Sequence, residues 1–364
     1  MPDYDVAVIG AGVFGAWTAW HLCRSGRRVL LVDAWGAGHS RSSSGGESRI
    51  IRMGYGADEI YTRMAMRSLE LWRGFDIFVP AGVLWIGREG DAYSAATLRT
   101  LQGAGVTIQV LSPAELRLRW PQMRPAESDV FGIFEPRSGA LMARRAVQAV
   151  VRDAMRHGVD YRIERVQPAA PLPARTLVFA CGPWLPKLFP DLLGKRLWPT
   201  RQEVFFFAPP AGDRRFVPGA LPVWIDFTHP LGPYGFPDIE ARGCKLAFDR
   251  HGEAFDPDSG DRTVSASSVA KARDFIGALF PALRDAPLTE ARVCQYENTS
   301  SGDFLIDRHP EWPDVWLVGG GSGHGFKHGP AVGEYVARQI LGEGVAEERF
   351  SLASKQERQQ RSVY

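Results

Sequence analysis

The chain has 364 residues, of which 45% are hydrophobic and 23% are charged, and its 43 Lys and Arg nearly balance its 41 Asp and Glu. This composition indicates a soluble globular protein long enough for two domains, and it excludes the broad basic surface that nucleic-acid binding requires. No apolar run reaches membrane-spanning length, and a core strand begins almost at once, so we expect a cytoplasmic protein without membrane partners.

The first predicted elements form a nucleotide-binding unit. A buried strand at 5–9 runs into Gly10-Ala11-Gly12-Val13-Phe14-Gly15 and an apolar helix to about Cys23, and a second strand at 29–32 ends on Asp33. Glycines between a strand and a helix let the backbone approach a pyrophosphate, and the acid accepts hydrogen bonds from ribose hydroxyls. The alternative is a tight turn that binds nothing. The motif alone leaves NAD and FAD open, whereas Asp33 disfavours NADP.

A basic stretch follows a Ser/Gly-rich loop at 36–46. Two isoleucines separate the arginines of Arg49-Ile50-Ile51-Arg52, and a helix is predicted at 59–72. Because the isoleucines should be buried, we expect at least one arginine to point into a cleft, where it could bind a substrate carboxylate. The alternative is a solvent-exposed basic strand or helix end.

From about residue 82 the pattern changes to short apolar runs bounded by Pro and Gly, which predict an antiparallel sheet. These runs lie at 83–86, 130–134, 204–207 and 223–225. A helix is predicted at 143–155, and buried strands of parallel type at 176–179 and 315–318, the last followed by a helix to about Leu341.

Parallel-type strands at both ends and in the middle of the chain predict two interleaved domains. We assign 1–77, 137–198 and 290–350 to a dinucleotide-binding domain and 78–136 and 199–289 to a substrate domain. Residues 351–364 form a polar tail that we expect to be disordered.

The most informative stretch is Gly319-Gly320-Gly321-Ser322-Gly323-His324-Gly325-Phe326-Lys327. A glycine-rich turn that opens a helix presents free N–H groups to an anionic, electron-rich ligand. His324 and His328 have metal-ligand spacing, but no acid or cysteine nearby completes a shell, so we predict no metal site. No nucleophile elbow supports a hydrolase, and Cys294 by itself reads as a small buried hydrophobe.

Taken together, these motifs resemble the monomeric sarcosine oxidase and N-methyltryptophan oxidase group of D-amino acid oxidase-like flavoenzymes, over nearly the whole chain. The resemblance rests on Gly10–Gly15 with Asp33, Gly46-Glu47-Ser48-Arg49-Ile50-Ile51-Arg52 with Tyr55-Gly56, Tyr234-Gly235-Phe236-Pro237 with Lys245, Cys294-x-Tyr296 before Asp303-Phe304-Leu305-Ile306-Asp307, and Ser322–Lys327. It implies an α/β fold in which a doubly wound, glutathione-reductase-type FAD domain is interleaved with an antiparallel-sheet α+β substrate domain.

The resemblance also implies FAD rather than NAD, bonded covalently through Cys294. Lys245 corresponds to the oxygen-activating lysine of the family, Arg49 would lie against the flavin ring, and Tyr234 is a further implied catalytic residue. Arg52 and Lys327 would bind a substrate carboxylate. The implied cofactor-binding residues are Gly10, Gly12, Gly15, Asp33, Ser44, Arg49, Cys294, Gly323, His324, Gly325, Phe326 and Lys327.

Two positions depart from the histidines that the family usually carries. Gly45 removes bulk near the flavin loop, which predicts a larger or differently shaped substrate than sarcosine. Asp249 adds an acid, which we count among the candidate catalytic residues because it could pair with a cationic substrate group. The alternative is that Asp249 simply faces solvent.

We therefore expect an FAD-dependent amine oxidase that converts a secondary or N-methyl amino acid into an imine, which hydrolyses, while O₂ is reduced to hydrogen peroxide. We expect a monomer whose only partners are the small-molecule amine and O₂. The alternatives are an oxidase of a cyclic imino acid or aryl-bearing amino acid, a flavin dehydrogenase with another acceptor, a non-catalytic flavin-binding protein and an NAD-dependent dehydrogenase. Lys245 argues against the flavin dehydrogenase, and Arg52 with Lys327 argues against the non-catalytic flavin-binding protein.

Overall fold

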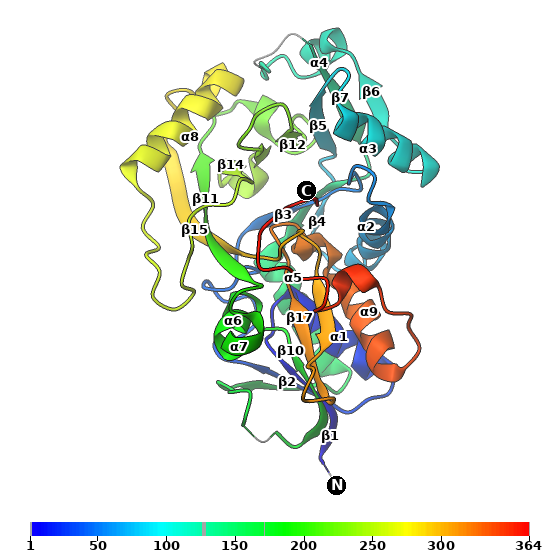
Figure 1. The fold of residues 1–364 in the computed structure, drawn as a ribbon. Coiled ribbons are helices and arrows are strands. Elements are labelled where there is room, and N and C mark those ends of the chain that lie inside the picture. Colours follow the sequence, from blue (N-terminus) through cyan, green and yellow to red (C-terminus); the bar gives the residue numbers. More distant parts are fainter. Residues whose placement is uncertain (1, 126–128, 171, 364) are drawn as a thin grey trace.

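A six-stranded, largely parallel sheet forms one half of the computed structural model, which describes residues 2–125, 129–170 and 172–363 (Figure 1). The strands lie in the order β16-β17-β10-β1-β2-β9. Only β16 runs antiparallel, at the edge. The predicted buried strands are confirmed, and the bounds are β1 (Tyr4–Ile9), β2 (Val29–Asp33), β9 (Asp160–Ile163), β10 (Ala174–Phe179), β16 (Leu305–Arg308) and β17 (Val315–Gly319).

Both faces of this sheet are covered, which explains why its central strands are apolar throughout. Val6 and Val8 of β1 pack into one core with the helices α1 (Val13–Arg24), α5 (Ala143–Arg156) and α9 (Gly329–Leu341). The alternating residues of the same strand, Ala7 and Ile9, pack into a second core with the short helices α6 (Leu185–Leu188) and α7 (Pro190–Leu193). The βαβ unit predicted from the sequence is thus the centre of a doubly wound layer structure.

A small antiparallel sheet brings the basic stretch to the middle of the molecule. Its strands are β3 (Ser48–Ile51), β8 (Gly139–Met142) and β4 (Phe78–Val79), in that order. The amphipathic helix α2 (Glu59–Trp72) has the bounds predicted from the sequence. Its Trp72 donates a hydrogen bond to the carbonyl oxygen of Lys327 (2.9 Å) and stacks on Phe326 (ring centroids 5.7 Å apart), so α2 positions the glycine-rich C-terminal motif.

The second half of the molecule is an eight-stranded sheet of order β15-β11-β14-β13-β12-β5-β7-β6, with helix α8 (Ala266–Leu279) packed on its core. We expected this sheet to be antiparallel, but β12 and β5 pair in parallel. No hairpin joins these two strands, because the chain passes through the first sheet between them. The bounds are β5 (Val83–Arg88), β6 (Gln109–Leu111), β7 (Val130–Glu135), β11 (Trp198–Phe207), β12 (Val223–Asp226), β13 (Pro233–Phe236), β14 (Cys244–Phe248) and β15 (Leu288–Asn298), with the connecting helices α3 (Ala92–Gly103) and α4 (Pro113–Arg119). The predicted domain boundaries stay a prediction, and β15 crosses one of them.

The C-terminal segment (residues 351–363) is folded against the body of the protein, so our expectation of a disordered tail is wrong. Leu352, Lys355 and Val363 are buried. The backbone N–H groups of Gln360 and Ser362 donate to the carbonyl oxygens of Ser300 (2.6 Å) and Ser301 (2.8 Å). The segment is polar in composition, but main-chain pairing and a few apolar anchors fix it, and the chain ends between the two large sheets (Figure 1).

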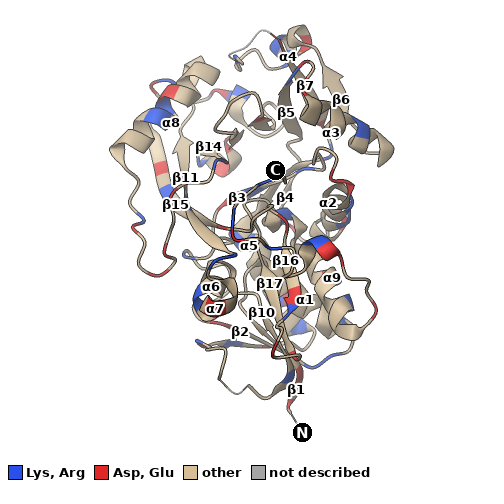
Figure 2. Cartoon of the chain, viewed as in Figure 1, with Lys and Arg blue, Asp and Glu red and all other residues tan. Residues whose placement is uncertain are grey.

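Acidic and basic residues are interspersed along the chain in both halves of the molecule (Figure 2). Within the part of the chain that the structure describes, no helix has both the length and the apolar composition needed to cross a membrane.

Candidate active site

Segments from both ends of the chain line one cavity, which we call the cofactor cavity. Gly10 and Gly12 follow β1, Asp33 ends β2, Cys294 lies on β15, and Gly323 lies in the turn after β17; all line this cavity. Gly10 has a φ of +106°, and a Cβ atom there would lie 2.4 Å from the carbonyl oxygen of Ala180. Only glycine fits this position, as expected where a backbone must approach a ligand.

Asp33 and Ser44 organise the first turn through backbone hydrogen bonds. One oxygen of Asp33 accepts from the N–H of Ala11 (2.8 Å), and the other accepts from the N–H groups of Trp35 (2.9 Å) and Gly36 (2.8 Å). The hydroxyl of Ser44 accepts from the N–H of Val13 (3.1 Å). Both residues lie on the cavity wall, and a contact between Asp33 and a ribose stays a prediction.

Two buried polar atoms on this wall fit a polar cofactor. Among the described residues, the hydroxyl of Ser43 and the Oε1 atom of Glu297 have no hydrogen-bond partner. The other carboxylate oxygen of Glu297 accepts from the N–H of Gly320 (2.9 Å), and burial raises the pKa of Glu297 to about 8. Buried polar groups are normally paired. A ligand with hydroxyl, amide or phosphate groups would satisfy these atoms, and FAD carries all of these or their equivalents.

Cys294, Arg49 and Lys245 lie together at the boundary between the two halves. The Nη2 atom of Arg49 lies 3.7 Å from the sulfur of Cys294 and donates to the carbonyl oxygen of Ser43 (2.5 Å). The ammonium group of Lys245 donates to the carbonyl oxygen of Ser48 (2.9 Å) and lies 4.6 Å from the centre of the Phe236 ring. Burial, and secondly Arg49, lower the pKa of Lys245 well below its ordinary value.

A second cavity of about 690 Å³ adjoins the first and shares Arg49, Tyr296, Gly323 and Phe326 with it; we call it the substrate cavity. Arg52 and Lys327 lie on its wall, where the structure brings together the two residues that we expected to bind a carboxylate. The guanidinium of Arg52 stacks between Tyr55 and Trp85, 4.6 and 4.9 Å from the ring centres.

Tyr55 connects this pair to the two histidines of the C-terminal motif. Its hydroxyl accepts a hydrogen bond from Lys327 (2.7 Å) and lies 2.7 Å from Nε2 of His328 and 3.2 Å from Nδ1 of His324. Burial, followed by the charge of Arg52, lowers the pKa of Lys327 well below its usual range. The histidines therefore belong to a hydrogen-bond network, and the described residues contain no group of three or more side chains placed to hold a metal ion.

Tyr234, Tyr296 and Asp249 form a polar chain across the substrate cavity. The two tyrosine hydroxyls are 3.4 Å apart, and Tyr296 donates to Asp249 (3.2 Å). Asp249 also forms an ion pair with Arg361 (2.9 Å). Asp249 therefore lines the substrate cavity and does not simply face solvent. The cation with which it pairs is Arg361 of the protein.

The structure does not bring every predicted residue to a cavity wall. Gly45 lines neither cavity: its carbonyl oxygen accepts from Arg144 (2.8 Å), and a Cβ there would lie 1.9 Å from the carbonyl oxygen of His39. The expectation that Gly45 widens the substrate pocket is therefore wrong, because the backbone of His39 fills the space that a side chain at this position would occupy. Gly15 is also absent from the walls of both cavities. His324 and Lys327, which we expected to bind the cofactor, line the substrate cavity and not the cofactor cavity.

Sequence reasoning missed several members of the substrate cavity, among them Phe227 and Arg361. Phe227 follows β12 and stacks on Trp85 with ring centroids 3.9 Å apart. Arg361 comes from the C-terminal segment. Neither residue lies in a motif, and only the folded chain places them there.

Comparison with known proteins agrees with this geometry. A family model described as FAD dependent oxidoreductase matches residues 5–339. Monomeric sarcosine oxidase of Streptomyces avermitilis is 34% identical, with 93% of this chain and 94% of the relative covered. N-methyl-L-tryptophan oxidase of Salmonella heidelberg is 28% identical, with 93% and 95% covered. The crystal structure of L-proline dehydrogenase from P. horikoshii superimposes with a TM-score of 0.83 at 20% identity, over 97% of this chain and 98% of that chain. The chain therefore belongs to the family of FAD-dependent oxidoreductases, in the group that contains the monomeric sarcosine oxidases.

Proposed function

We propose that the protein oxidises secondary or N-methyl amino acids to imines and passes the electrons to O₂, which yields hydrogen peroxide. The observation that carries this proposal is the pairing of Arg52 with Lys327 in a cavity that adjoins the cofactor cavity. The names of the related sarcosine and N-methyl-L-tryptophan oxidases support the substrate class.

The residues of the cofactor cavity would hold FAD, which supplies a two-electron acceptor when it is bound. The turn at Gly10 and Gly12 would receive the pyrophosphate, and the backbone from Gly323 to Phe326 would face the other end of the cofactor. Arg49, shared by both cavities, would lie where cofactor and substrate meet.

Arg52 and Lys327 would bind the substrate carboxylate and thereby hold the amine-bearing carbon toward the shared wall. An arriving carboxylate favours the charged form of Lys327, whose pKa is lowered by burial and by Arg52 in its absence. The aromatic side chains around Arg52 exclude water from this contact and so strengthen it.

We also propose that Cys294 bonds covalently to the flavin, because its thiol lies on the cofactor cavity near the guanidinium of Arg49. Acid-precipitated protein should stay yellow, and Cys294→Ala protein should release its colour into the supernatant. Colour that leaves the wild-type pellet would disprove the bond.

We further propose a cytoplasmic monomer. All four cysteines are free thiols, which is usual in a reducing compartment. Light scattering on the purified protein should give the mass of one chain, and a dimer mass would contradict this part of the proposal.

A peroxide-coupled assay with sarcosine and larger N-methyl amino acids tests the proposed reaction. Arg52→Gln should raise KM for these substrates at least about tenfold, because it removes a charged partner of the carboxylate. The matched methyl esters, which lack the charge, should be nearly insensitive to the substitution. Equal increases in KM for the acids and their esters would show that Arg52 does not bind the carboxylate.

A second candidate is an oxidase of a cyclic or aryl-bearing amino acid. The observation in its favour is the size of the substrate cavity, about 690 Å³, together with the aromatic wall of Tyr93, Phe227 and Tyr234. The same assay with pipecolate, proline and N-methyltryptophan would rank these substrates against sarcosine. A repeat without O₂ and with an artificial electron acceptor would separate an oxidase from a dehydrogenase.

A further inference from the structure

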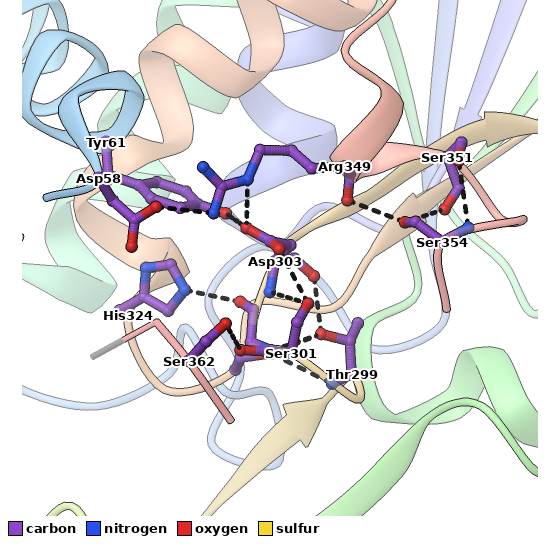
Figure 3. Close-up of polar contacts among 12 residues, drawn as sticks. Asp58, Tyr61, Thr299, Ser301, Asp303, His324, Arg349, Ser351, Ser354 and Ser362 are labelled. Atoms are coloured by element: carbon purple, nitrogen blue, oxygen red, sulfur yellow. Dashed lines mark hydrogen bonds and ion pairs between the residues drawn. The ribbon is translucent and has the colours of Figure 1, made fainter. Parts of the chain in front are cut away.

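The C-terminal segment contributes a side chain to the substrate cavity. Arg361 lies on the cavity wall, and its Nε atom donates to the carbonyl oxygen of Val363 (2.9 Å). The neighbouring residues are fixed: Ser362 donates from its backbone N–H to Ser301 (2.8 Å), and Val363 is fully buried. Figure 3 shows Ser362 beside Ser301. Arg361 is therefore held in place by its own segment.

The substrate cavity has a surplus of positive charge. Among its described lining residues, one is a carboxylate, Asp249, and five are basic: Arg49, Arg52, Arg250, Lys327 and Arg361. Such a surplus attracts anions into a cleft. Burial, and secondly the charge of Arg361, lower the pKa of the neighbouring His251 to about 4.

Asp249 partly neutralises the charge of Arg361 through an ion pair. Its Oδ1 atom accepts from Tyr296 (3.2 Å), and its Oδ2 atom lies 2.9 Å from Nη1 of Arg361. A cationic substrate group would have to displace Arg361 from Asp249 and remain beside the other basic residues. An anionic group can approach Arg361 while Asp249 keeps its bond to Tyr296. The charges on the wall therefore favour an anion.

We propose that Arg361 is a specificity-determining residue that binds a second acidic group on the substrate, such as the side-chain carboxylate of an N-methylated acidic amino acid. This inference rests on the proposed function for its first carboxylate, which Arg52 and Lys327 would bind. The cavity volume of about 690 Å³ leaves room for the longer side chain. Asp249 competes for Arg361 and so limits the strength of this contact.

The test compares N-methyl-L-glutamate with N-methyl-L-glutamine, which differ mainly in charge at the side-chain end. The ratio of their kcat/KM values should exceed about ten in the wild-type holoenzyme, the effect of one charge-assisted hydrogen bond. Arg361→Gln should bring the ratio close to one, whereas Asp249→Asn should raise it. Arg358→Gln, on an exposed neighbour in the same segment, should leave it unchanged. Two variants that shift the ratio in the same direction would show that the ion pair is only structural and would overturn the assignment.

Further measurements test whether the positive charge at Arg361 binds the second acidic group. Arg361→Lys preserves the charge and should retain most of the ratio, and if Arg361→Gln fails to fold, the wild-type ratio should still fall as salt is raised. Binding of glutarate and glutaramate, read from the flavin absorption spectrum, does not need turnover. If glutarate binds more tightly but none of the N-methyl amino acids is oxidised, the anion site at Arg361 would stand and the proposed function would be rejected. Equal binding of the two would overturn the role of Arg361 even where oxidation is observed.

Discussion

Lys245 is a buried amine in a small pocket that shares Arg49 and Cys294 with the cofactor cavity, and its protonation state decides what it can do. It donates to Ser48 (2.9 Å), while burial and then Arg49 lower its pKa from the ordinary value of 10.5. A fixed cation here would stabilise the negative charge that develops as O₂ is reduced. The charged form exists only below the lowered pKa. The rate of flavin reoxidation by O₂ should therefore fall as the pH rises through a value below 10.5.

Replacing Lys245 by Met should slow reoxidation by about 10²-fold or more and abolish this pH dependence. Flavin reduction by the amine, measured anaerobically in a stopped-flow instrument, should change little. Lys195→Met, on the exposed surface, is the matched control. Equal slowing of both half-reactions would contradict the role in O₂ reduction.

Glu297 makes stability depend on pH in a direction opposite to that of most carboxylates. Burial raises its pKa from 4.5 to about 8, so the folded protein keeps a proton that the unfolded chain releases near 4.5. Stability from this group is complete below pH 4.5 and is lost as the pH rises toward 8, by up to about 5 kcal/mol.

Glu297→Gln resembles the protonated side chain and should remove this loss. Thermal unfolding at pH 5, 7 and 9 should give similar Tm values for both proteins at pH 5 and a growing advantage of Glu297→Gln above it. A constant difference at the three pH values would show that Glu297 is ionised in the folded protein.

At the scale of elements, the turn between β1 and α1 depends on glycine for two different reasons. Gly10 needs its positive φ, whereas a Cβ at Gly15 would lie 1.9 Å from the carbonyl oxygen of Gly10. Gly15→Ala must therefore push α1 away from β1, at a cost of at least about 2 kcal/mol.

The matched control is Gly103→Ala, in helix α3, where a Cβ has nothing within 4 Å. Alanine there should stabilise the protein by up to about 1 kcal/mol. Urea denaturation and the ratio of flavin to protein absorbance measure both effects. We expect Gly15→Ala protein to lose bound flavin and Gly103→Ala protein to keep it. Full flavin content in Gly15→Ala protein would contradict the tight contact.

Elements with a strong burial pattern were predictable from the sequence, and those without one were not. Strands β1 and β2 are apolar because both faces are covered, and α2 has one apolar face, so each could be predicted. The edge strand β9 is mostly exposed and carries Asp160 and Arg162, and α8 buries few of its residues. The parallel pairing of β5 with β12 arises from chain crossings that no local pattern encodes.

At the scale of the whole molecule, the candidate site combines residues from every part of the chain. Cys294, Arg52 and Lys327 could be found because each lies in a recognisable motif. Arg361 could not be found, because its segment is polar and reads as disordered until Ser300 and Ser301 are available to bond its backbone. Gly45 shows the opposite error, since the sequence beside a motif does not reveal that the backbone of His39 lies where a side chain at Gly45 would be.

Arg349 joins three distant parts of the chain just before the C-terminal segment (Figure 3). It forms ion pairs with Asp303 (2.8 Å), in the loop before β16, and with Asp58 (2.9 Å), at the start of α2. Asp303 is buried and also accepts from Tyr61 (2.7 Å). Removing Arg349 leaves a buried carboxylate with one partner fewer, so Arg349→Ala should destabilise the protein by about 2 kcal/mol.

The same substitution should loosen the C-terminal segment, because the ion pairs of the Arg349 side chain anchor the backbone whose carbonyl oxygen accepts hydrogen bonds from Lys355 and Ser354. Hydrogen exchange of residues 351–363 should therefore accelerate more than exchange in the parallel sheet. Arg63→Ala is the control: its ion pair with Glu59 (2.6 Å) is exposed, and its loss should cost at most about 0.5 kcal/mol. If Arg349→Ala costs no more than Arg63→Ala and leaves exchange at 351–363 unchanged, Arg349 does not fix this segment. In that case the position of Arg361 would depend on the backbone bonds to Ser300 and Ser301, the ion pair with Asp249 and the burial of Val363.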